Sequence, residues 1–152
     1  MSRAFVKEQE IVEELPERLI SEHPNLVTSA GLKQIEAEVA RFDTAHAAAQ
    51  ADGDREAMAA TARDLRYWSA RLSTAELVHV PADGGHVHFG SKVTIEREDG
   101  RRQTYRIVGE DEADPAKGSV SYVSPLARAL LGKRVGDEGV VNGAEVEVIA
   151  VH

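Results

Sequence analysis

The chain has 152 residues, 42% of them hydrophobic and 29% charged, which is typical of a globular protein with one ordinary domain or two small ones. Its formal net charge of −8 argues against general nucleic-acid binding, which needs a basic surface, so we expect no sequence-specific DNA partner. Cysteine is absent, which excludes disulfides, zinc thiolates and cysteine nucleophiles.

The chain begins with a polar segment, residues 1–27, in which glutamates are interrupted by Pro16 and Pro24. Because its apolar residues keep no sustained period, we expect a flexible, mostly extended arm. The segment has no signal-peptide core, and no apolar run in the chain is long enough to span a bilayer. The sequence therefore predicts a cytoplasmic protein with no membrane partner.

From residue 28 the pattern becomes helical. Two stretches step by three and four, namely Leu32, Ile35, Val39, Phe42, His46 and Ala49, then Met58, Thr61, Leu65, Trp68, Leu72 and Ala75. Asp52-Gly53-Asp54 separates them with turn chemistry. We predict an antiparallel helical hairpin over residues 28–79, with arms of about 22 residues and a reach of about 33 Å. Pairing with a second copy into a four-helix dimer is an open alternative, since the alanine-rich end buries little.

Beyond Val80-Pro81 the period changes to two. Strands are expected around Val87 to Ile95 (as one strand or a bulged pair broken at Gly90-Ser91), at Tyr105–Val108, at Gly139–Val141 and at Val146–Val151, with hairpin turns at Asp99-Gly100 and Asn142-Gly143. Val120 to Val123 leads into a short helix. The expected fold is α+β: the helical hairpin, then a small antiparallel β domain with one short helix over residues 80–152.

The short helix has both of its ends specified. Ser124 suits the N-cap and Pro125 the first helical position, where a missing N–H costs nothing. Leu126, Leu130 and Leu131 share one face at helical spacing. Gly132 suits the left-handed residue that closes a helix. A turn at Gly136-Asp137 then leads into another strand.

This order of residues resembles the signature of the Gre family of bacterial transcription elongation factors (GreA/GreB). The resemblance covers residues 28–152 and is carried by four motifs together: Thr28 to Leu32, Phe89-Gly90, Tyr105-Arg106-Ile107-Val108-Gly109, and Ser124 through Asp137. It implies an FKBP-like fold for the C-terminal domain. It also implies a domain that docks at the secondary channel of RNA polymerase while the coiled coil enters that channel.

The resemblance also implies where the functional residues lie. Polymerase contacts are expected from the helix region Ser124, Pro125, Leu126 and Arg128. The acidic coil tip consists of Asp52, Asp54 and Glu56, of which Asp54 and Glu56 are candidate ligands, shared with the polymerase, for the magnesium ion that cleaves backtracked RNA. On this interpretation the chain has no catalytic residue, metal or cofactor of its own, and contacts nascent RNA only indirectly.

Two departures from the family pattern bear on cleavage. Gly53 and Asp54 match the family tip, but Glu56 stands one position nearer to Asp54 than the family glutamate, and the family's asparagine is missing. Each arm is also about ten residues shorter than in the cleavage factors, which removes roughly 15 Å of reach. The alternative is a short-coiled relative that occupies the channel without cleavage, with the tip aspartate only capping the second helix.

Other residue clusters are weighed on their chemistry. His86 and His88, two apart on an expected strand, could ligate a metal, but no third ligand is apparent. Arg63, Arg66 and Arg71 with Arg41 could form a basic stripe, or a solvated face paired with Glu36, Glu38 and Asp64. An FKBP-like peptide-binding or isomerase function is a further alternative, although only 5% of residues are aromatic. No catalytic triad, phosphate loop or nucleotide fingerprint is visible.

Overall fold

The computed structural model describes residues 15–79 and 85–152, and these form two compact units. The hairpin unit contains residues 15–22 and 33–74, and the sheet unit contains residues 23–32 and 75–152. The chain passes between the units three times: after Glu22, within its first long helix after Leu32, and after Thr74. The expected ranges 1–27, 28–79 and 80–152 stay a prediction. None of the helices in the described ranges is long and apolar enough to cross a membrane.

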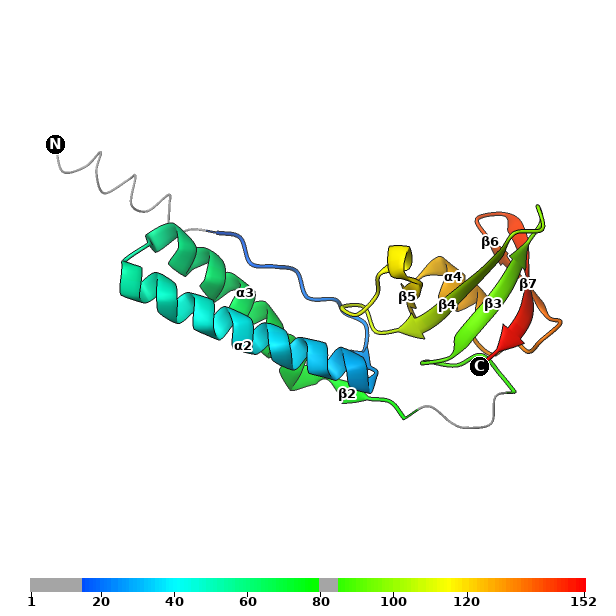
Figure 1. The fold of residues 1–152 in the computed structure, drawn as a ribbon, viewed down its shortest axis with the longest axis horizontal. Coiled ribbons are helices and arrows are strands. Elements are labelled where there is room, and N and C mark those ends of the chain that lie inside the picture. The colour runs from blue at the N-terminus through cyan, green and yellow to red at the C-terminus, as the bar shows by residue number, and fades with distance from the viewer. Residues whose placement is uncertain (1–14, 80–84) are drawn as a thin grey trace. The chain divides into compact units, whose positions relative to one another are not determined.

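The hairpin unit is built from two helices, α2 (Ser29–Asp52) and α3 (Arg55–Thr74), which lie side by side in Figure 1. Their lengths of 24 and 20 residues correspond to about 36 and 30 Å of helix. The predicted seams face each other, since His46 of α2 lies 2.9 Å from the Thr61 hydroxyl of α3. Ile35, Ala49 and Trp68 are the buried residues of these seams, so the hairpin packs thinly, as its alanine content predicts.

The larger sheet of the sheet unit has five strands in the order β5-β4-β3-β7-β6. They are β3 (Lys92–Arg97), β4 (Arg102–Val108), β5 (Ser119–Ser121), β6 (Glu138–Val141) and β7 (Ala144–Val151). Three of the four pairings are antiparallel. The exception is β4–β5, which is parallel because residues 109–118, with the 3₁₀ turn Pro115–Lys117, carry the chain back to the level of Arg106, in the second half of β4. The α+β fold class is confirmed.

One expected strand is shorter than predicted. Val87 and Phe89 are buried, but they belong to an irregular segment, and β3 begins only at Lys92. Val87 exchanges backbone hydrogen bonds with the loop after the short helix, accepting from Gly132 and donating to Lys133. The alternation of apolar residues from Val87 onward therefore predicted correctly which side chains are buried, but it did not predict where strand pairing begins.

A second, two-stranded sheet was not predicted. β1 (Leu26–Val27) and β2 (Glu76–Leu77) pair in parallel within the sheet unit. The backbone of β1 lies against Gly109, where a Cβ atom would come within 2.3 Å of the Leu26 carbonyl oxygen. Glycine at the end of the Tyr105–Gly109 motif is thus required by a close approach of two backbones.

The segment expected to be a flexible arm over residues 1–27 is described by the structure from residue 15 onward. Residues 1–14 lie outside the described residues, but residues 15–27 have specific contacts. Asn25 and Val27 are 5% and 3% exposed, and the Tyr122 hydroxyl donates a hydrogen bond to the Pro24 carbonyl. The lack of a helical or strand period in this segment could not indicate these contacts, because each one joins a single residue of the segment to a residue far away in the sequence.

Candidate functional site

The short helix α4 (Pro125–Leu130) is closed at both ends as predicted. The Ser124 hydroxyl accepts a hydrogen bond from the Ala127 amide at 3.2 Å, and Pro125 occupies the first helical position. At the other end the Leu131 amide donates to the Ala127 carbonyl, and Gly132 follows at φ +83°. A helix of six residues is too short to persist alone in water, so these ends and its packing must hold it.

The packing of α4 divides the four predicted contact residues into two kinds. Ala127 and Leu130 are 0% and 1% exposed within the core of the sheet unit, and Leu126 packs against that core. Pro125 and Arg128 are exposed. Ser124 uses its hydroxyl in the cap. The structure thus leaves Pro125 and Arg128 available to a partner, while Ser124 and Leu126 position the helix.

The helix α4 lies against β6 at a glycine. A Cβ atom on Gly139 would meet the Ala129 carbonyl oxygen at 2.8 Å, closer than side chains normally come to backbone. Figure 1 shows α4 beside β5 and β6. The orientation of the Pro125–Arg128 surface therefore depends on the absence of a side chain at Gly139, in the next strand along the chain.

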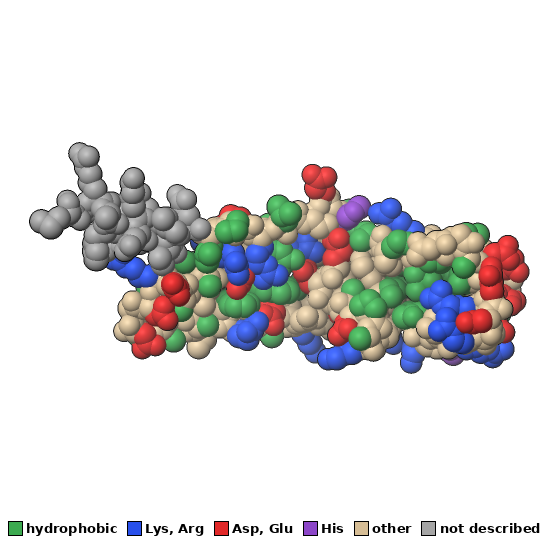
Figure 2. All heavy atoms as spheres, turned by 90° about the horizontal axis from the view of Figure 1, so that it is seen from above, with side chains coloured by type: hydrophobic (Ala, Val, Ile, Leu, Met, Phe, Trp, Pro, Cys, Tyr) green, Lys and Arg blue, Asp and Glu red, His purple; other side chains and the backbone are tan. Residues whose placement is uncertain are grey.

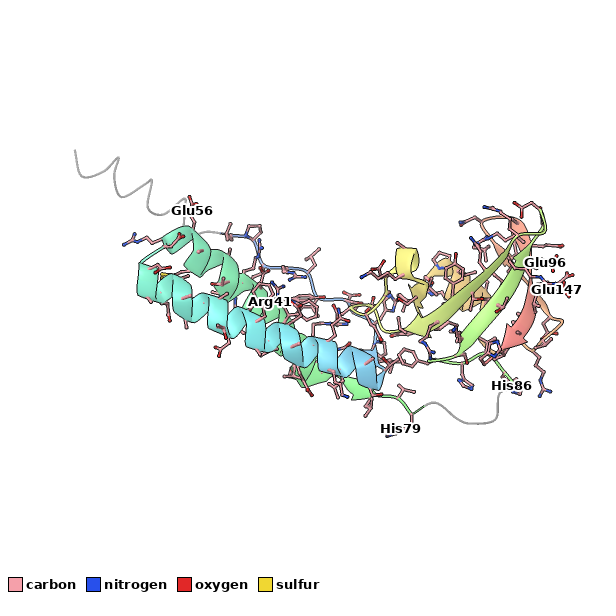
Figure 3. All side chains as sticks on the ribbon, in the orientation of Figure 1. Arg41, Glu56, His79, His86, Glu96 and Glu147 are labelled. Carbon is pink, nitrogen blue, oxygen red and sulfur yellow. The ribbon has the colours of Figure 1, made fainter. Side chains whose placement is uncertain are left out.

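The hairpin tip carries the three predicted acids on an exposed turn. Asp52 ends α2, Gly53 has φ +65°, and Asp54 precedes α3. One carboxylate oxygen of Asp54 accepts from the Ala57 amide at 3.1 Å, so Asp54 caps α3. Glu56 lies in the first turn of α3 and projects from the tip in Figure 3, where its charge complements the helix dipole. The capping interpretation of the tip aspartate is confirmed.

The two histidines do not form a metal site. His86 accepts a hydrogen bond from the Arg134 guanidinium at 2.9 Å, whereas His88 contacts the buried Ser91 hydroxyl at 3.1 Å. The expected common strand face is absent, because both residues lie in the irregular segment before β3. Throughout residues 15–79 and 85–152, no group of three histidine or carboxylate side chains has the arrangement needed to hold a metal ion.

The arginines of the hairpin are engaged individually. Arg41 pairs with Glu38 and Arg63 with Asp64, as the solvated-face interpretation predicts. Arg71 is buried at 2% exposure. On the face shown in Figure 2, basic and acidic side chains are intermixed along the hairpin.

Arg66 has a partner that sequence reasoning missed. Its guanidinium holds both carboxylate oxygens of Glu17, from the segment before α2. This hydrogen bonding is the main cause that lowers the pKa of Glu17 below its ordinary value. The next residue, Arg18, reaches Asp64 at 3.3 Å. No local signal could have revealed these contacts, because 49 and 46 residues separate the partners.

A cluster of glutamates on the sheet was also missed. The strand register places Glu147 opposite both Glu96 and Glu138, and Figure 3 shows Glu96 and Glu147 as neighbours. Arg102 pairs with Glu96 at 3.3 Å, and the Glu98 carboxylate accepts from the Glu145 amide at 3.0 Å. Like charges opposite one another disfavour pairing. The arginine and the amide offset part of that cost.

The sheet unit has a hollow of about 520 Å³ that bears on the isomerase alternative. It is lined by Thr28, Ser29, Ala30, Leu77, Val78, His79, Gly90, Arg106 and Glu112. None of these residues is aromatic. The Phe89–Tyr122 pair, with ring centroids 5.7 Å apart, lies outside this lining. The described residues thus give no aromatic proline pocket at this hollow.

The capped helix on a small curled sheet, joined to a helical hairpin with an acidic tip, is the two-part plan that the motifs predict. Residues 82–152 match the family described as transcription elongation factor, GreA/GreB, C-terminal. The wider relatives extend this match over the hairpin. The chain belongs to the GreA/GreB family of transcription elongation factors.

Three relatives show how far the similarity runs. The chain is 36% identical to transcription elongation factor GreA of Beijerinckia indica, over 91% of this chain and 88% of that protein. It is 35% identical to GreA of Desulfovibrio desulfuricans, over 84% of this chain and 76% of that protein. It is 47% identical to GreB of Pasteurella multocida over 77 residues, about half of each protein. Among solved structures, GreA factor homolog 1 of Thermus thermophilus shares 22% identity, covers 86% of this chain and 99% of its own, and has a TM-score of 0.42.

Proposed function

We propose that this chain regulates transcription elongation by binding RNA polymerase at the secondary channel in the cytoplasm. Family membership supports a role in elongation. The observation that carries the proposal is α4, whose caps and core packing hold Pro125 and Arg128 outward on a fixed surface. A proline ring and an arginine fork are groups that a partner can recognise with little loss of conformational freedom.

Copurification with core polymerase tests this binding. The variant Arg128→Glu is expected to weaken binding at least tenfold, because it reverses a charge at the proposed contact. Arg101→Glu is the matched control, because Arg101 is an exposed arginine of the sheet unit that pairs with Asp99 in the β3–β4 turn. Equal loss from both variants, or no binding by the unmodified chain at low salt, contradicts the proposal.

At the tip we propose channel occupancy as the primary activity. Asp54 is already engaged in capping α3, and helices of 24 and 20 residues give about 30 to 36 Å of reach. An exposed acidic turn of this kind can change access to the channel without touching a metal.

Assistance to transcript cleavage is the second candidate, and three exposed carboxylates at one turn favour it. In that case Asp54 and Glu56 would share the polymerase's magnesium ion, which supplies Lewis-acid activation of water. Incubation of a stalled, backtracked complex separates the two activities. Magnesium-dependent shortening of the RNA 3′ end identifies cleavage, whereas an unchanged transcript with inhibited nucleotide entry identifies occupancy.

A dimer in which two hairpins form a four-helix bundle is a further proposal. The thin seam near Ala49 motivates it, since a second hairpin would bury more apolar area. Sedimentation at high concentration is expected to show whether copies associate, and a monomer excludes the four-helix dimer.

A further inference from the structure

Residues 15–22, which we call the arm, belong to the same compact unit as the hairpin helices. They form neither helix nor strand and run beside α3 (Figure 1). Side-chain contacts of Glu17 and Arg18 attach them. Glu17 binds the Arg66 guanidinium, Arg18 pairs with Asp64, and the Arg18 guanidinium lies 3.9 Å from the centre of the Tyr67 ring. The arm is thus a peptide bound to a helix face within one chain.

The attachment is polar and open to solvent. The side chains of Glu17 and Arg66 are 62% and 56% exposed, and Leu19 and Ile20 of the arm are 94% and 49% exposed. Surface ion pairs add little net stability because water and salt screen them. An arm that buries so little of its own apolar surface can be displaced by a competitor at modest cost.

The arm covers a surface with a defined chemistry, formed by Arg63, Asp64, Arg66, Tyr67 and Trp68, which we call the arm face. The Arg66 guanidinium donates hydrogen bonds to both oxygens of the bound carboxylate. The aromatic rings of the face receive a guanidinium, with Arg18 lying 5.6 Å from the Trp68 ring centre as well. The face is therefore complementary to an extended peptide in which an acidic residue is followed directly by a basic one.

We propose that the arm face is a docking site for an extended segment of a partner protein that carries an acidic residue followed directly by a basic one, and that the arm occupies it in the free chain. Asp64 decides between a peptide and a nucleic acid. Its carboxylate pairs with Arg63 of the face and also with Arg18 of the arm, each at 3.3 Å, so the site favours a cation next to the bound anion. A peptide with the Glu-Arg order of residues 17 and 18 supplies both charges, whereas a run of phosphates meets repulsion at Asp64. The site lies on α3 and does not depend on the proposed contacts of α4.

Displacement of the arm can be measured in the full chain. Trp68 is the only tryptophan, so its emission reports on the arm face. The double variant Glu17→Gln with Arg18→Gln removes the ion pairs and the cation–ring contacts of the arm, while leaving the side chains of the arm face unchanged. The probe is a fluorescein-labelled peptide with the sequence of residues 15–22. We expect it to bind the double variant at least tenfold more tightly than the unmodified chain, with a change in Trp68 emission.

Matched variants decide what the probe recognises. Adding Arg66→Gln to the double variant is expected to abolish binding, whereas adding Arg41→Gln, on the other helix, is expected to leave it unchanged. Far-ultraviolet circular dichroism verifies that each variant keeps its helices. Equal binding to the double variant and the unmodified chain, or binding that survives Arg66→Gln, overturns the proposal. Binding of oligouridylate at least as tight as that of the peptide overturns the choice of a protein partner.

Discussion

The two surfaces proposed to act on the polymerase, α4 and the hairpin tip, are built under very different constraints. The α4 helix has a serine cap, a closing glycine, two fully buried residues and a strand glycine against its backbone. The tip has a capping aspartate and an open turn, where a Cβ atom on Gly53 would meet nothing within 4 Å. Packing on the sheet therefore fixes the α4 surface, whereas the proposed action of the tip depends on the reach of the hairpin and on the charge of its turn.

The largest expected effect comes from removing the core contact of α4. Leu130 is 1% exposed and belongs to the core cluster of the sheet unit. Leu130→Ala is expected to lower the free energy of unfolding by about 2–5 kcal/mol through lost burial and the cavity left behind. Asp52→Ala at the tip is expected to change it by less than about 0.5 kcal/mol. Denaturant unfolding followed by circular dichroism measures both, and similar losses would remove the contrast between the two surfaces.

The next effect tests the backbone approach beneath α4. Gly139→Ala places a Cβ atom 2.8 Å from the Ala129 carbonyl, so we expect a loss of about 1–3 kcal/mol in unfolding free energy and weaker polymerase binding as α4 shifts. Val140→Ala is the control, because Val140 is the next residue of β6 and 62% exposed. Wild-type stability for Gly139→Ala would mean that α4 is not constrained by this contact.

What the sequence could predict follows the same division. The hairpin, the capped helix and the Asn142-Gly143 turn, with φ of +52° and +80°, rest on local periodicity and turn chemistry. The parallel β1–β2 pair and the Glu17–Arg66 contact depend on residues about 50 positions apart, so no local pattern could indicate them. At the candidate site the sequence located α4 and the tip acids, but only packing separates exposed Pro125 and Arg128 from the residues that hold the helix.

Asp54 offers a way to separate structure from activity at the tip. Asp54→Ala is expected to cost about 1 kcal/mol through loss of the cap on α3, and Asp54→Asn to cost little, because both side chains cap well. Thermal unfolding followed by Trp68 fluorescence measures the difference. If the tip only occupies the channel, Asp54→Asn keeps full activity on the polymerase. Loss of transcript cleavage in Asp54→Asn, with stability unchanged, would instead assign the carboxylate a role with the magnesium ion.

The smallest effect concerns the arm, where a titration can be followed. Hydrogen bonding to Arg66 lowers the pKa of Glu17, so the contact stabilises the bound arm above the ordinary glutamate pKa of about 4.3 and this stabilisation is lost as pH falls through the lowered value. We expect Trp68 emission to shift over that acidic range in the unmodified chain and not in Glu17→Gln. Glu22→Gln, in the same segment, is expected to keep the shift. If all three chains give the same emission profile, the Glu17 carboxylate does not hold the arm. The surface of the hairpin would then be set by its two helices alone, as at the tip, and not by packed contacts of the kind that fix α4.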